Sequence, residues 1–97
     1  MTNVVITQMP AFKNTYKKLH LRDRLQVNDA IKAIIQNPRI GQEKKGDLSG
    51  IFVYKFKMDG REILLAYEWN FKHRILVAMC IHENFYRDLK KYRKYRY

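Results

Sequence analysis

A tight turn between two alternating segments constrains the fold of this chain more than any other feature. Asp59-Gly60 is a typical two-residue β-hairpin turn, because both residue types tolerate the positive φ angles that such a turn requires. In the segment before it, 51–58, aromatic and apolar side chains alternate with a second set that includes Lys55 and Lys57. The segment after it, 62–69, alternates in the same way. The sequence therefore predicts two adjacent antiparallel strands with one strongly apolar face.

The flanking segments supply further elements. Residues 74–81 are apolar at nearly every position, which predicts a central strand, and the β-branched run 4–7 predicts a short first strand. Between them, Pro10 favours the start of a helix with a stripe of Phe12, Tyr16 and Leu19.

A second helix is expected from Asp23, as its N-cap, to Asn37, because the residue before Pro38 is disfavoured in a helix. Its buried stripe is expected to contain Val27, Ala30, Ile31, Ile34 and Ile35. Residues 39–50 have the composition of a loop, and residues 83–95 have a helical pattern. The predicted order is β-α-α-β-β-β-α. This is an α+β domain over residues 1–97, with a helical hairpin packed on a small, twisted, mainly antiparallel sheet.

The charge of the chain points to a polyanionic partner. Twenty Lys and Arg residues against nine Asp and Glu residues give a formal net charge of +11 over 97 residues. Such a balance is typical of domains that bind nucleic acid. Alternative partners are an acidic protein and an anionic lipid surface. A further alternative is a basic surface without a specific partner.

The sequence does not favour a disulfide, a metal site, a cofactor or a membrane span. Cys80 is the one cysteine and lies in an apolar run, so we expect a buried thiol. His20 and His73 lack carboxylate or cysteine neighbours at the spacing of metal ligands. No apolar run approaches about 18 residues, and no secretory signal is evident, so we expect a cytoplasmic protein.

Five motifs, in order along nearly the whole chain, resemble the RelE/ParE superfamily of bacterial toxins from type II toxin–antitoxin modules. They are Asn37-Pro38-Arg39-Ile40-Gly41, Lys45-Gly46-Asp47-Leu48-Ser49-Gly50, Val53-Tyr54-Lys55-Phe56-Lys57, Leu64-Leu65-Ala66-Tyr67 and His82-Glu83-Asn84-Phe85-Tyr86-Arg87-Asp88-Leu89. The resemblance implies a twisted sheet backed by two helices, an acidic or amphipathic antitoxin as partner, and usually cleavage of mRNA on the ribosome. Some members of the superfamily instead inhibit DNA gyrase and have no nuclease site.

The resemblance also assigns roles to individual residues. Lys55 and Lys57 match two strand lysines of RelE-like nucleases, which bind the RNA backbone and stabilise its transition state. His82 and Tyr86 resemble the histidine and aromatic residue of the YafQ-like branch, where the histidine does acid–base work and the aromatic ring stacks on a base. RelE carries an arginine on the third strand where this chain has Leu64. Arg61, three residues earlier, is the candidate to replace that arginine.

These residues suit RNA cleavage without a metal ion, in which the 2′-OH of the RNA is the nucleophile. The reaction needs a base for that hydroxyl, positive charge for the phosphorane, and an acid for the leaving 5′-oxygen. A histidine such as His82 can fill either proton role near neutral pH. Each residue also has a structural interpretation: His82 as a helix cap, Lys55 and Lys57 as a solvated sheet face, Arg61 as a turn residue, and Tyr86 as core.

The sequence thus predicts an endoribonuclease toxin that binds mRNA and ribosomal RNA and is neutralised by a cognate antitoxin. A gyrase inhibitor that acts by binding is the alternative, and a non-toxic nucleic-acid-binding module is a third interpretation. Further basic residues are expected to form a diffuse RNA-binding surface: Lys13, Lys17, Lys18, Lys44, Lys45, Arg87 and Lys90.

Overall fold

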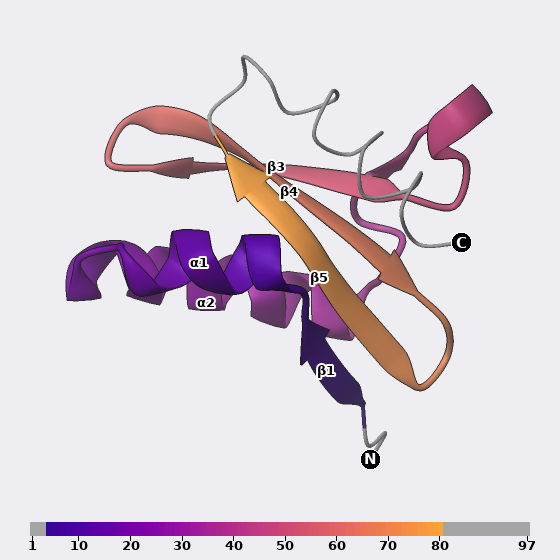
Figure 1. The fold of residues 1–97 in the computed structure, drawn as a ribbon, viewed down its shortest axis with the longest axis horizontal. Helices are drawn as coiled ribbons and strands as arrows, with labels where there is room; N and C mark the ends of the chain where they lie inside the picture. The colour runs from indigo at the N-terminus through magenta and orange to yellow at the C-terminus, as the bar shows by residue number, and fades with distance from the viewer. Residues whose placement is uncertain (1–3, 81–97) are drawn as a thin grey trace.

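Helices cover one face of a five-stranded mixed sheet (Figure 1). The structure is a computed structural model and describes residues 4–80. Strand β1 pairs in parallel with β5, and the remaining neighbours are antiparallel, in the order β1-β5-β4-β3-β2. The elements are β1 (Val5–Gln8), α1 (Pro10–Lys17), α2 (Leu21–Gln36), β2 (Gln42–Glu43), the 3-10 turn η1 (Gly46–Leu48), β3 (Phe52–Met58), β4 (Arg61–Trp69) and β5 (His73–Cys80).

The local signals in the sequence position most of these elements. Pro10 begins α1, and α2 ends at Gln36, one residue before Asn37-Pro38. Asp59 and Gly60 adopt φ angles of 53° and 77°, as a primed hairpin turn requires. The predicted α+β class is confirmed, and the helix predicted over residues 83–95 lies outside the described residues.

Two local predictions need correction. Asp23 is not the N-cap of α2, because the helix begins at Leu21 after His20, and the Asp23 carboxylate lies in the first turn. At this position the Asp23 carboxylate still interacts favourably with the positive end of the helix dipole. The predicted loop 39–50 contains β2, in which Gln42 pairs with Val53. Two residues are too few to show an alternating pattern, so the sequence gives no sign of this strand.

The sheet has an apolar core on each of its faces. Between helices and sheet, Phe12 of α1 and Ile34 of α2 pack in one cluster with Leu65. On the other face, a second cluster is formed by Leu48, Ile51, Val53, Leu64, Ala66 and Val77. Strand β4 contributes to both, and each of its residues from Ile63 to Tyr67 is at most 2% exposed. Within residues 4–80, no helix has the length and apolar content to cross a bilayer.

Two polar side chains fasten the end of α2 to the sheet. The guanidinium of Arg74, a buried residue on β5, donates hydrogen bonds to the carbonyls of Ile34 and Ile35 at 3.2 and 3.0 Å. These carbonyls belong to the last turn of the helix, where partners within the helix are missing. The hydroxyl of Tyr67 donates to the carbonyl of Pro38 at 2.6 Å and accepts from the N–H of Gly41 at 3.0 Å.

The position of Gly41 follows from this contact. A Cβ atom at Gly41 would lie 2.7 Å from the Tyr67 hydroxyl oxygen and 2.9 Å from the carbonyl oxygen of Val53. Any larger residue would therefore push the loop away from the hydroxyl that anchors it.

Tyr67→Phe should lower stability and change how stability depends on alkaline pH. Burial raises the pKa of the Tyr67 hydroxyl above its ordinary value of 10.0, although the Gly41 N–H and Arg74 oppose the shift. The folded chain thus keeps this proton to higher pH than the unfolded chain. Its contribution is complete below about pH 10 and is lost as the pH rises through the folded-state pKa. We expect Tyr67→Phe to lower the free energy of unfolding by about 1–2 kcal/mol at pH 7.

Urea unfolding at pH 7, 9 and 10.5 measures both effects. Tyr54→Phe is the matched control, because Tyr54 is a half-buried tyrosine on the neighbouring strand. Its stability should stay within about 0.5 kcal/mol of the wild type. If Tyr67→Phe is as stable as the wild type and loses stability equally above pH 10, the hydroxyl does not anchor the loop.

Candidate functional site

Lys55 and Lys57 lie on β3, on the sheet face opposite the helices, and both are exposed. They project to the same side as Val53, which belongs to the second apolar cluster. Successive side chains on one face of a strand are roughly 6.6 Å apart. The face of β3 therefore changes from apolar to cationic toward the Asp59-Gly60 turn.

The register of the sheet defines the neighbours of the two lysines. Lys55 lies across from Leu64, and Leu64 in turn lies across from Cys80 on β5. Lys57 lies across from Glu62. One lysine thus borders a buried apolar side chain, and the other faces a carboxylate that reduces the local positive charge.

Arg61 lies on the other side of the sheet. It pairs with Met58, whose side chain belongs to the core beneath the helices. Arg61 lines a cavity of about 280 Å³ together with Leu19, which lies between α1 and α2, and Met79 of β5, among others. The structure therefore does not bring Arg61 together with Lys55 and Lys57, and the position across from Lys55 is filled by Leu64.

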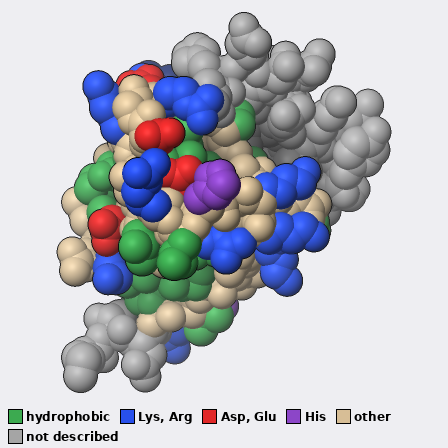
Figure 2. Space-filling model, turned by 90° about the vertical axis from the view of Figure 1, so that its left-hand side faces the viewer, with side chains coloured by type: hydrophobic (Ala, Val, Ile, Leu, Met, Phe, Trp, Pro, Cys, Tyr) green, Lys and Arg blue, Asp and Glu red, His purple; other side chains and the backbone are tan. Residues whose placement is uncertain are grey.

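The other described basic residues are spread over the molecule. Lys13 and Lys17 are exposed on α1, and Lys18 is exposed at its end. Lys44 and Lys45 precede η1, and the backbone N–H of Lys44 donates to the carbonyl of Ile51 at 2.8 Å. Figure 2 shows Lys and Arg side chains scattered among acidic and hydrophobic ones on one side of the molecule. Their role in RNA binding stays a prediction.

Four predicted site residues, His82, Tyr86, Arg87 and Lys90, lie outside the described residues. The described chain ends at Cys80, in the row that contains Leu64 and Lys55. His82 follows Cys80 by two positions in the sequence.

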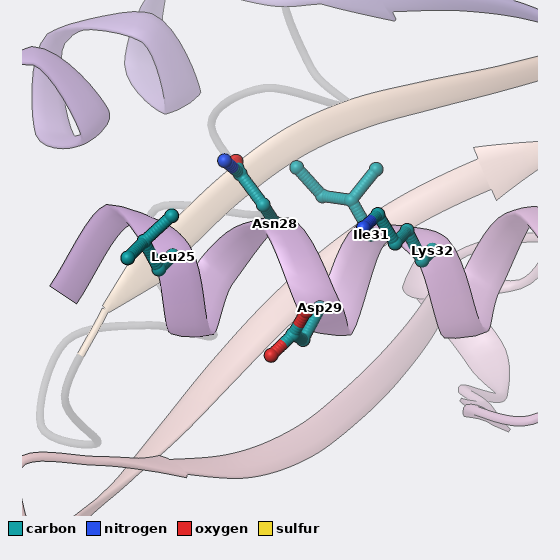
Figure 3. Close-up of a pocket in the computed structure, with 5 residues that line it drawn as sticks. All are labelled: Leu25, Asn28, Asp29, Ile31 and Lys32. Carbon is teal, nitrogen blue, oxygen red and sulfur yellow. The ribbon is translucent and has the colours of Figure 1, made fainter. Parts of the chain in front are cut away.

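A shallow hollow on α2 is not suggested by the sequence. Its volume is about 550 Å³, and its lining comes from Leu25, Asn28, Asp29, Ile31 and Lys32 (Figure 3). Asn28 and Asp29 point to opposite sides of the helix. The lining brings no pair of proton-transfer groups together. Within residues 4–80, no three His, Cys, Asp or Glu side chains are grouped as a metal ion would require.

Comparison with solved structures identifies the fold. A chain of the intact E. coli RelBE toxin–antitoxin complex is 17% identical, with a TM-score of 0.65 over 82% of this chain and 98% of that chain. A double mutant of the E. coli toxin RelE in the free state is 12% identical, with a TM-score of 0.70 over 98% of both chains. A YoeB/ParE toxin from Agrobacterium tumefaciens is 14% identical, with a TM-score of 0.63 over 82% of this chain and 100% of that chain. These identities are low, so the similarity shows a shared fold.

Sequence comparison supplies the family. A search of curated proteins finds no significant match. A family model described as the ParE-like toxin of type II bacterial toxin-antitoxin systems matches residues 6–90, which is most of the chain. The membership in the RelE/ParE superfamily that the motifs predicted is confirmed, and the chain belongs to the family of ParE-like toxins of type II bacterial toxin–antitoxin systems.

Proposed function

We propose that this toxin is a metal-independent endoribonuclease that cleaves mRNA on the ribosome in the cytoplasm. The observation that supports the proposal is the exposed pair Lys55 and Lys57 on the sheet face opposite the helices, in register with the end of β5 that leads to His82 in the sequence. A chain with a net charge of +11 is attracted to RNA over long distances.

Each residue has a distinct role in the proposed reaction. His82 transfers a proton, either from the attacking 2′-OH or to the leaving 5′-oxygen. Lys55 and Lys57 hold the phosphate and stabilise the charge that develops on the phosphorane. Tyr86 stacks on a neighbouring base. Arg61 has no role in this mechanism, because it lies on the opposite face of the sheet.

Inhibition of DNA gyrase by binding is the second candidate function. The matching family model is ParE-like, and Leu64 occupies the position of an arginine that RelE-like nucleases use. Glu62 across from Lys57 also lowers the positive charge of the face. A supercoiling assay with purified toxin, run beside primer extension on a reporter mRNA, separates the two functions. New 5′ ends without a change in supercoiling support the nuclease, and growth arrest without new ends contradicts it.

His82→Ala and Lys57→Ala should slow cleavage for different reasons. Loss of a general acid or base should reduce the single-turnover rate on programmed ribosomes by about 10²–10⁴-fold. Loss of the Lys57 charge should reduce the rate about tenfold or more, and the deficit should depend on ionic strength. Lys32→Ala is the matched control, because Lys32 is an exposed lysine on α2 and should leave the rate unchanged.

Thermal unfolding of the same variants separates catalysis from structure. His82→Ala should fold and unfold like the wild type. If His82→Ala cleaves at a near-wild-type rate but is less stable, His82 is structural, and the acid–base role belongs to another group.

The cognate antitoxin should cover the Lys55 and Lys57 face with an acidic segment that has an apolar stripe. The acidic side chains of such a segment complement the two exposed lysines. Acetylation of lysines, read by mass spectrometry, should therefore fall at Lys55 and Lys57 when the antitoxin is bound, whereas Lys32 should react equally. A complex that cleaves RNA at the full rate with both lysines still reactive would refute this arrangement.

A further inference from the structure

The turn between β4 and β5 presents an aromatic ring to solvent. Phe71 is 72% exposed, as exposed as any large hydrophobic residue within the described chain. We propose that this turn is a second RNA-binding site, at which Phe71 stacks on an unpaired base and Lys72 contacts the adjacent phosphate. The inference rests on the proposed function in that RNA is the ligand, but it concerns a surface away from the cleavage face.

The turn is held in one conformation by its own hydrogen bonds. The side-chain oxygen of Asn70 accepts from the N–H groups of Lys72 and His73 at 2.9 and 3.0 Å. The guanidinium of Arg74 donates to the carbonyl of Asn70 at 2.8 Å. The N–H of Val5 on β1 donates to the carbonyl of Lys72 at 2.8 Å. A turn whose backbone is fixed in this way loses little backbone freedom when its ring stacks on a base.

The charges around Phe71 favour RNA as the partner. Lys72 and His73 are exposed, and residues 69–74 contain no acidic residue. At the same end of the sheet, the guanidinium of Arg39 lies 5.3 Å from the centre of the Trp69 ring. Aromatic rings interleaved with cations are the arrangement that binds single-stranded nucleic acid, because every base has a face on which a ring can stack. Val5 on the adjacent strand is 52% exposed. An exposed apolar residue would also suit a protein partner, so the test must distinguish RNA binding from protein binding.

The distance between Lys57 and the β4–β5 turn along the sheet indicates which kind of RNA binds at the turn. The β3–β4 and β4–β5 turns lie at opposite ends of the sheet (Figure 1). Glu62, which pairs with Lys57, and Trp69 are seven residues apart on β4, about 23 Å at 3.3 Å per residue. A codon-sized segment at Lys57 does not need to extend to Phe71. The ligand of the turn is thus an unpaired base in a folded RNA, such as a loop in the RNA that presents the substrate.

Binding of a labelled RNA hairpin with an unpaired loop tests this site. The hairpin carries 2′-O-methyl groups so that it cannot be cut, and a blunt duplex of the same stem serves as the comparison. Phe71→Ala should weaken hairpin binding by about 5- to 150-fold, whereas Phe71→Trp should retain it. Leu21→Ala is the matched control, because Leu21 is also 72% exposed, and it should bind like the wild type. Lys72→Ala should reduce, by about one, the slope of the logarithm of the binding constant against the logarithm of the salt concentration.

The outcomes either support or overturn the assignment. Binding of the duplex should not respond to Phe71→Ala, and the variant should unfold at the wild-type temperature because the ring is exposed. If Phe71→Ala binds the hairpin like the wild type, or loses affinity only for the antitoxin, the turn is not an RNA site. If the toxin does not cut RNA but Phe71→Ala still loses hairpin affinity, the proposed function fails and this site stands.

Discussion

The middle of strand β4 is buried on both faces, and the arrangement of the other elements follows from the need to cover it. Five consecutive residues from Ile63 to Tyr67 alternate between the two apolar clusters. The helical hairpin covers one side, and the segment from Leu48 to Val53 contributes to the cluster on the other. Toward the Asp59-Gly60 turn, Lys55 and Lys57 take the place of apolar residues on this face of β3, and both are exposed, because burial of a charged side chain is costly. The candidate site thus lies where this face of β3 changes from apolar to charged.

Burial separates the structural cations from those available to a ligand. In a strongly basic toxin, Arg74 would be a natural candidate for phosphate binding. Its guanidinium is instead occupied by backbone carbonyls of α2 and of the β4–β5 turn. It therefore stabilises the end of a helix and a turn at once. The same turn holds Phe71 outward, so a buried structural contact positions an exposed candidate binding residue.

The sequence predicted the features that depend on neighbouring residues. Alternation around Asp59-Gly60 located the hairpin, and Asn37-Pro38 located the end of α2. The face of Arg61 was also predictable, since a two-residue turn pairs it with Met58 and hence with the apolar side of the sheet. Contacts between distant segments were not predictable, because the bonds from Arg74 to Ile34 and Ile35 span about forty positions of sequence. The exposure of Phe71 likewise depends on which elements pack against the turn.

The chemistry of the cut ends tests the central claim most directly. If His82, Lys55 and Lys57 promote attack by the 2′-OH, no water attacks the phosphate in the first step. Cleaved mRNA should then carry a 5′-hydroxyl end and a 2′,3′-cyclic phosphate or 3′-phosphate end. Adaptor ligation to RNA from cells that express the toxin, with and without prior kinase treatment, identifies these ends. Cleavage products that ligate only after the kinase step, and that disappear with His82→Ala, are the expected result. Ends that ligate without kinase treatment, or their persistence with His82→Ala, would contradict the proposed mechanism.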